Sequence, residues 1–69
     1  MPGGELTPNL RDHRTRAGLT QQQLAERVSV TRKTINTIEN GVFVPSTTLS
    51  LKLARTLGTT VEELFSLTS

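Results

Sequence analysis

The sequence predicts an all-α domain built from five short helices. Apolar residues recur at intervals of three and four along five segments, which is the spacing of one helix face. A Ser or Thr that can cap a helix stands just before each segment, and three of the segments are followed by Gly. No segment shows the alternation typical of a strand, so no sheet is expected. With 69 residues, the chain has the length of one small domain.

The N-terminal part is expected to hold an arm and the first helix. Residues 1–6, MPGGEL, combine Pro with paired Gly and predict a flexible arm ahead of a domain at 7–69. Thr7 followed by Pro8 is typical of an N-cap with proline at the first helical position. The first helix should therefore begin at Pro8 and end at Ala17, just before a Gly.

The second and third helices follow in quick succession. Thr20 and Gln23 have the spacing of a capping box and predict a second helix that ends near Val28. Thr31 is the expected N-cap of a third helix, which ends before Gly41. The apolar residues expected to face the core from these two helices are Leu24, Ala25, Val28, Ile35 and Ile38.

The last two helices are predicted from the same signals. Ser46 caps a fourth helix over 47–57, and Thr60 caps a fifth over 61–67. The fifth helix has two glutamates in its first turn, where negative charge is favoured by the helix dipole. The side chains expected inside the domain from the fourth helix are Leu49, Leu53, Ala54 and Leu57.

The composition argues against several classes of protein. There is no Cys, and His13 is the only His, so neither a metal site nor a cofactor is expected. No catalytic site is evident, because the sequence shows no nucleophile that His13 could activate. The chain is therefore not expected to be an enzyme. No apolar run is long enough to cross a membrane and no signal peptide is visible, so the expected location is the cytoplasm.

The charge is distributed unevenly. Residues 11–33 carry six basic side chains against two acidic ones, whereas residues 34–69 carry two against three. This asymmetry favours a surface that binds a polyanion, although a solvated surface of mixed charge would look similar. Arg11 and Arg16, on the first helix, are expected to be solvated.

The link between the second and third helices is the most informative segment. It spans about three residues from Ser29 to Thr31, and so short a link forces the helices to cross steeply, as in a helix-turn-helix. The second helix of that motif enters the major groove of DNA. Arg32 and Lys33 then stand at the N-terminal turn of this helix, where the dipole disfavours cations unless an anion approaches.

These residues resemble a known family. The stretch LTQQQLAERVSVTRKTINTIENG, followed by VPS, is similar to the phage-repressor/Cro-like (Xre) helix-turn-helix family, and most of all to its short standalone bacterial regulators. The resemblance covers Asn9 to Phe65. It implies a lambda-repressor-like fold of five helices, a homodimer, and sequence-specific binding to double-stranded DNA at a two-fold symmetric operator, close to the nucleoid.

The resemblance also implies roles for individual residues. The DNA-binding set carried over from the family is Gln21, Thr31, Arg32, Lys33, Asn36, Thr37 and Asn40. Arg32 suits a bidentate contact with guanine, and Asn36 could pair with adenine. Gln21 would bond a phosphate and brace the third helix. Arg14 and Glu39 would form a structural ion pair between the first and third helices. Ser29 replaces the Gly often found at the turn, which would cost ~1 kcal/mol if its φ is positive.

The apolar residues exceed what so small a core can bury. An exposed apolar patch usually marks a partner surface. We expect a dimer interface formed by Val61, Leu64 and Phe65, with Phe43 at its edge. The alternative is that Leu64 closes the core of a single protomer.

The sequence is consistent with two functions. The first is a transcriptional regulator that represses by occluding a promoter. The second is an antitoxin-like protein that binds a toxin partner and autoregulates its operon, a role that small domains of the family also serve. A neighbouring toxin gene would distinguish them.

Overall fold

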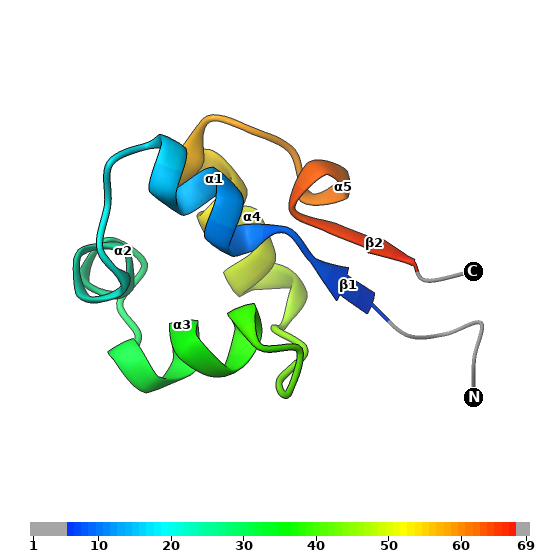
Figure 1. Cartoon of the computed structure of the whole chain (residues 1–69), viewed down its shortest axis with the longest axis horizontal. Helices are drawn as coiled ribbons and strands as arrows, with labels where there is room; N and C mark the ends of the chain where they lie inside the picture. The colour runs from blue at the N-terminus through cyan, green and yellow to red at the C-terminus, as the bar shows by residue number, and fades with distance from the viewer. Residues whose placement is uncertain (1–5, 68–69) are drawn as a thin grey trace.

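The computed structural model describes residues 6–67, which form five helices and two short strands (Figure 1). In chain order the elements are β1 (Leu6–Pro8), α1 (Leu10–Arg16), α2 (Gln21–Arg27), α3 (Arg32–Glu39), α4 (Thr47–Leu57), α5 (Val61–Leu64) and β2 (Phe65–Leu67). The all-α prediction is therefore confirmed for the body of the domain, and the two strands are an addition to it.

Side-chain caps start four of the helices where the sequence predicts. Thr20 and Gln23 form the complete capping box of α2, with Gln23 N donating to Thr20 Oγ1 over 3.0 Å and Thr20 N donating to Gln23 Oε1 over 2.9 Å. Thr31, Ser46 and Thr60 accept from the backbone of the third residue inside α3, α4 and α5. These bonds satisfy amide groups that the first helical turn leaves without a partner.

The prediction for the N-terminal segment was wrong. Thr7 and Pro8 belong to β1, not to α1, which begins at Leu10 after Asn9. Leu6, assigned to the flexible arm, also lies in β1, while the rest of that predicted arm lies outside the described residues. Proline fits this position because a strand at a sheet edge does not need its missing amide hydrogen.

The C-terminal helix is also shorter than predicted, because residues 65–67 pair with β1 as a strand. α5 ends at Leu64, and the chain turns into β2, which runs antiparallel to β1 with Leu6 opposite Leu67 and Pro8 opposite Phe65 (Figure 1). Asn9 N also donates to Leu64 O over 2.7 Å. The two ends of the domain are thus tied together by a ribbon whose partners are far apart in sequence.

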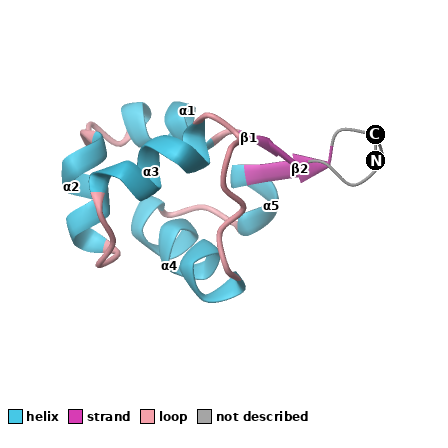
Figure 2. Cartoon of the chain, turned by 90° about the horizontal axis from the view of Figure 1, so that it is seen from below, coloured by secondary structure: helices cyan, strands magenta, loops and turns pink. Residues whose placement is uncertain are grey.

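All five helices contribute buried side chains to the hydrophobic core, and Figure 2 shows how these helices are arranged. Its fully buried side chains include Leu10, Leu24, Ile35, Ile38, Leu53 and Leu64. Ala25, Val28 and Ala54 are also buried as predicted, whereas Leu49 and Leu57 are only partly buried. In residues 6–67 there is no helix with the length and apolar character needed to cross a bilayer.

The turn between α2 and α3 has the geometry that the motif requires. Ser29 adopts a φ of 62°, in the left-handed region that a residue with a Cβ occupies at a cost of ~1 kcal/mol or more. Val30 N then donates to Ala25 O over 3.0 Å, which closes the end of α2 before Thr31 begins the next helix. The expected strain at Ser29 is therefore present.

Candidate nucleic-acid interface

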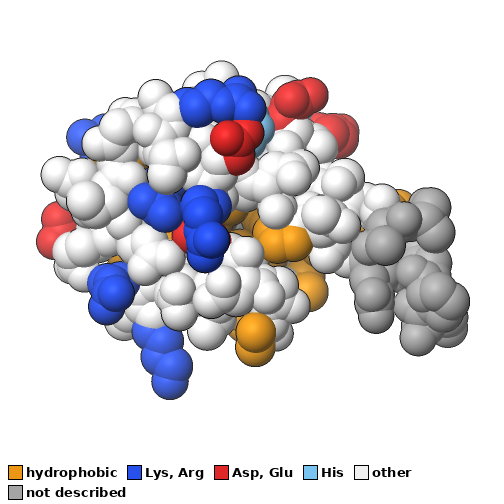
Figure 3. All heavy atoms as spheres, viewed as in Figure 1, with side chains coloured by type: hydrophobic (Ala, Val, Ile, Leu, Met, Phe, Trp, Pro, Cys, Tyr) orange, Lys and Arg blue, Asp and Glu red, His pale blue; other side chains and the backbone are white. Residues whose placement is uncertain are grey.

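The first turn of α3 lies open to solvent. Thr31, Arg32 and Lys33 are all exposed, and α3 lies along one side of the molecule with its N-terminal end beside α2 (Figures 1 and 3). Lys and Arg side chains gather over this half of the molecule, whereas hydrophobic side chains reach the surface near the loop after α3 (Figure 3). The arrangement leaves two cations free to approach an anionic partner.

The threonines of α3 are less free than the cations. Thr31 Oγ1 accepts from Thr34 N over 3.3 Å and lies 3.1 Å from Thr34 Oγ1. Thr37 is partly buried and donates its hydroxyl to Thr34 O over 2.9 Å. Their hydroxyls are thus engaged inside the helix, which leaves mainly their methyl groups to contact a partner.

A buried ion pair joins α1 to α3, as the family resemblance implies. Arg14 Nε lies 2.6 Å from Glu39 Oε2, and the side chains are 12% and 0% exposed. Arg14 also donates from Nη2 to Glu39 Oε1 over 3.2 Å and from Nη1 to Leu19 O over 2.8 Å. A fork of this kind fixes the angle between the two helices, because both charges are satisfied only in this arrangement.

The surroundings of Glu39 determine its ionisation. Burial of its carboxylate would by itself raise the pKa of Glu39, but hydrogen bonds from Arg14, Gln21 and Arg11 and the charge of Arg14 outweigh burial, so the pKa is lowered below its ordinary value. The carboxylate is therefore ionised at neutral pH even though its side chain is fully buried.

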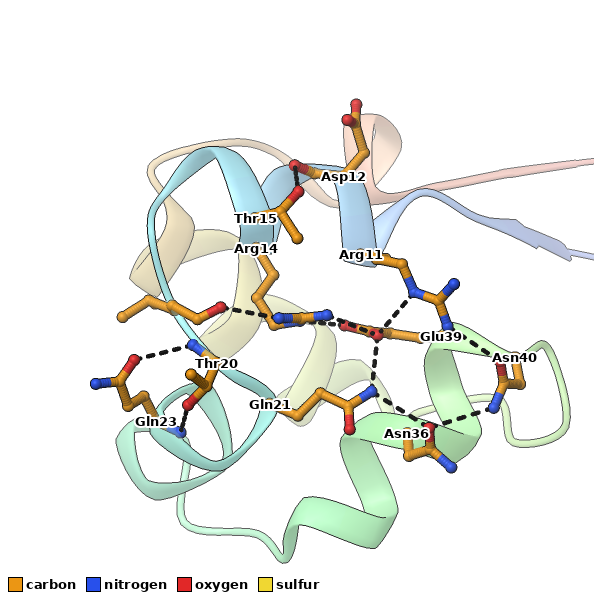
Figure 4. A network of polar contacts seen from close by, with 11 residues as sticks. Arg11, Asp12, Arg14, Thr15, Thr20, Gln21, Gln23, Asn36, Glu39 and Asn40 are labelled. Carbon is orange, nitrogen blue, oxygen red and sulfur yellow. Dashed lines mark hydrogen bonds and ion pairs between the residues drawn. The ribbon is translucent and has the colours of Figure 1, made fainter.

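Four more polar side chains surround this ion pair (Figure 4). Gln21 Nε2 donates to Glu39 Oε1 over 3.0 Å and to Asn36 Oδ1 over 3.2 Å. Asn40 Nδ2 donates to the same Asn36 oxygen over 3.3 Å. Gln21 therefore connects the start of α2 to two residues of α3.

Arg11 was predicted to be solvated, and its side chain is 60% exposed, but it also bonds to two residues at the end of α3. Its Nε donates to Glu39 Oε1 and its Nη2 to Asn40 Oδ1, both over 3.3 Å. Arg16, by contrast, pairs with the exposed Asp12 on the same helix. Arg11 and Arg14 lie three residues apart on one face of α1, so both can reach Glu39 once α1 and α3 cross.

The residues predicted to form a dimer interface have different exposures. Leu64 is fully buried and Phe65 is 9% exposed, so both belong to the core of the protomer. Val61 is partly buried and Phe43 is 46% exposed. Phe43 and Phe65 line one hollow together with Leu6, Val44 and Pro45.

Comparison with known proteins agrees with this geometry. The helix-turn-helix family model HTH_3 matches residues 10–64. The chain belongs to this family, the Xre/Cro-like helix-turn-helix proteins. Its members are DNA-binding transcriptional regulators and not enzymes.

Two curated relatives illustrate the likeness in sequence. An uncharacterized HTH-type transcriptional regulator of Methanothermobacter thermautotrophicus is 49% identical over 57 residues, which cover 81% of this chain and 83% of the relative. The uncharacterized HTH-type transcriptional regulator YgzD of Bacillus subtilis is 40% identical over 56 residues, covering 81% and 85%. Both are thus similar to the chain over most of their own length.

Two solved structures illustrate the likeness in fold. The restriction-modification controller protein C.AhdI of Aeromonas hydrophila superposes with a TM-score of 0.73 at 35% identity, over 78% of this chain and 82% of that one. The clp gene regulator ClgR of Corynebacterium glutamicum superposes with a TM-score of 0.74 at 30% identity, over 78% of this chain. The chain spans 57% of the ClgR chain.

Proposed function

We propose that this helix-turn-helix protein is a homodimeric repressor that binds a two-fold symmetric operator with α3 in the major groove. The observation that carries the proposal is the exposed first turn of α3, where Arg32 and Lys33 project beside Thr31. In the helix-turn-helix motif, this turn reaches the base edges while the preceding helix crosses the DNA backbone.

The proposed roles within α3 follow from side-chain chemistry. Arg32 offers the planar fork that matches guanine O6 and N7. Lys33 supplies a second cation for phosphate or guanine. The methyl groups of Thr31 and Thr37 are suited to contact thymine methyls, because their hydroxyls are used within the helix.

The phosphate contact expected of Gln21 needs a change in its bonding. Both hydrogens of its side-chain amide are directed to protein acceptors, Glu39 and Asn36. Since a phosphate oxygen can only accept, the side chain of Gln21 can reach a phosphate only by giving up one of these bonds. Bracing α3 is therefore the larger part of its proposed role, and Asn40 is proposed to approach the backbone beside it.

The dimer is proposed to form through the end of the molecule that carries α5 and the ribbon. Phe43 and Val61 would contribute to the interface directly, while Leu64 and Phe65 support it from the core. The adjoining surface carries both Arg55 and Glu62 beside Val61. Charges of both signs suit a two-fold interface, in which the same surface meets itself. Such a dimer would present two α3 helices ~34 Å apart.

The test is fluorescence anisotropy with a labelled duplex from upstream of the protein's own gene. A scrambled duplex of equal length serves as the control, and both are titrated at two salt concentrations. We expect the native duplex to bind at least ~10³-fold more tightly than the scrambled one near physiological salt. Affinity for both should fall as salt rises, because bound Lys and Arg displace counterions from the phosphates.

A pair of lysine variants sharpens this test. Lys33→Ala should weaken binding to the native duplex about tenfold, because it removes a charge from the proposed groove-facing turn. Lys52→Ala removes the same charge from the exposed face of α4 and should change affinity little. Equal weak binding to both duplexes, or equal effects of the two variants, would contradict the proposal.

A further inference from the structure

The polar side chains around Glu39 form a closed ring of hydrogen bonds (Figure 4). Taken in order, the ring consists of Arg11 to Asn40 (3.3 Å), Asn40 to Asn36 (3.3 Å), Gln21 to Asn36 (3.2 Å), Gln21 to Glu39 (3.0 Å) and Arg11 to Glu39 (3.3 Å), with the donor named first. Three helices contribute to it, but only α3 belongs to the proposed groove contact.

The direction of every bond in this ring is fixed by two of its members. An ionised carboxylate only accepts hydrogen bonds, so Gln21 must turn its NH₂ group toward Glu39. A guanidinium only donates, so Asn40 must turn its oxygen toward Arg11. The side-chain amides of Gln21 and Asn40 can therefore be oriented in one way only, because Glu39 must accept and Arg11 must donate.

Asn36 is approached by a hydrogen-bond donor from each of its two neighbours in the ring. Gln21 reaches it with an N–H, and Asn40 reaches it with an N–H from the other side. Asn36 must meet both with its Oδ1, so its Nδ2 points away from the ring (Figure 4). Asn36 is exposed on α3 and presents this nitrogen to the outside.

We infer that the ring fixes Asn36 as a donor-only contact to DNA, and that Arg11 is the positioning residue that sets this polarity from outside the groove. The inference rests on the proposed function. It replaces the expected pairing of Asn36 with adenine, since that pairing needs one amide donor and one amide acceptor, and the acceptor is already occupied twice.

The partner of Asn36 must then be a hydrogen-bond acceptor on DNA. Guanine offers two acceptors in the major groove, N7 and O6, whereas adenine places a donor beside its N7 and thymine has the single acceptor O4. Guanine is therefore the base best suited to a group that only donates, and a phosphate oxygen is the acceptor outside the bases. Neither guanine nor a phosphate predicts a preference for adenine at the position that Asn36 reads.

The first experiment selects duplexes from a randomised library with the wild type, Asn36→Ala, Arg11→Met and Arg16→Met. Arg16→Met is the matched control, because it removes the same charge from the same helix, and the two side chains are similarly exposed at 60% and 68%. The wild type should favour guanine over adenine at the position where Asn36→Ala loses its preference. Arg11→Met should reduce that ratio about fivefold, which corresponds to one hydrogen bond, and Arg16→Met should not.

The same variants distinguish the two acceptors. If Asn36 donates to a phosphate, Asn36→Ala and Arg11→Met should weaken binding to all duplexes alike, and more than Arg16→Met does. Either pattern supports the donor-only contact. A wild-type preference for adenine at the position controlled by Asn36, or equal effects of Arg11→Met and Arg16→Met, would overturn it.

A second measurement needs no DNA and so separates this inference from the proposed function. Both side-chain NH₂ protons of Gln21 donate inside the ring, whereas those of Asn36 point outward, so NMR of the ¹⁵N-labelled protein should find slower exchange with water at Gln21 than at Asn36. Arg11→Met should reduce this difference more than Arg16→Met does. Slower exchange at the Asn36 NH₂ than at the Gln21 NH₂ would overturn the ring polarity whether or not the protein binds an operator.

Discussion

The two ends of this domain handle polar and apolar side chains in opposite ways. Where α1, α2 and α3 meet, a buried carboxylate is bonded by Arg11, Arg14 and Gln21. At the other end, the loop after α3 and the ribbon leave Val42, Phe43, Val44 and Leu67 exposed. One end is complete within the protomer, and the other carries apolar surface that a second surface could cover.

This difference indicates which end of the domain is rigid and which end has apolar surface that a partner could cover. A fully bonded polar cluster is satisfied in one geometry, so it holds α3 at a fixed angle before DNA arrives. Apolar side chains in water gain free energy from any partner that covers them. The polar end therefore suits recognition by shape and charge, and the apolar end suits the proposed dimer.

The largest effect is expected from Glu39→Gln at the polar end. It leaves the guanidinium of Arg14, only 12% exposed, without its counter-charge and should lower the free energy of unfolding by about 3 kcal/mol. Asp12→Asn is the control, because it breaks the exposed pair with Arg16 and should cost less than ~0.5 kcal/mol. Urea denaturation measures both, and equal losses would show that the cluster does not hold the helices together.

At the apolar end, Phe43→Ser should weaken the dimer by about 2 kcal/mol, close to thirtyfold in the dissociation constant, because a buried aromatic face would be lost. The unfolding of the protomer should change less, since Phe43 is already 46% exposed. Sedimentation equilibrium measures the constant, with Ala17→Ser, at the exposed position just after α1, as control. A dimer equally tight in Phe43→Ser would place the interface elsewhere.

A gain in stability of ~1 kcal/mol is expected from Ser29→Gly in the turn that joins α2 to α3. Glycine adopts a φ of 62° without the steric cost that the Ser Cβ incurs. The same substitution at Ser66, which lies in β2, should destabilise the protein instead. Thermal unfolding of the two variants checks this pair, and a loss of stability in Ser29→Gly would refute the strain.

The smallest effect is the pH dependence of stability that comes from the ionisation of Glu39. It is negligible near neutral pH and increases in acid. Its pKa is lowered in the folded protein, so its contribution to stability is present above the ordinary value of 4.5 and is lost as pH falls through the lowered pKa. The stability gap between the wild type and Glu39→Gln should therefore be constant from pH 8 to pH 6 and narrow below about 4.5. A gap that stays constant into acid would mean that the carboxylate is not bonded as described.

Much of this fold could be predicted because its signals are local. Thr20, Thr31, Ser46 and Thr60 cap helices through contacts within three residues, and the core residues follow the helical period. The ribbon could not be predicted in this way, because Pro8 pairs with Phe65 across nearly the whole chain and each strand has three residues. Thr7 and Pro8 have the local pattern of a helix start, but the pairing of β1 with β2 places them in a strand.

In the candidate site, too, local features could be predicted and contacts between distant residues could not. Arg32 and Lys33 are identified by their place in the motif, and the Arg14–Glu39 pair by the family resemblance. The bonds of Arg11 could not be read from the sequence, because they depend on how α1 and α3 cross, which brings residues 28 and 29 positions apart together. The orientation of Asn36 follows only once that ring is known.

The most direct test of the central claim compares the two ends within one complex. Backbone amide resonances of ¹⁵N-labelled protein would be followed by NMR during titration with a duplex selected for tight binding. The largest shifts should fall on residues 31–37, with little change over 42–45 and in β2. Large shifts confined to the loop and the ribbon, with α3 unchanged, would contradict the assignment of α3 as the helix that reads DNA.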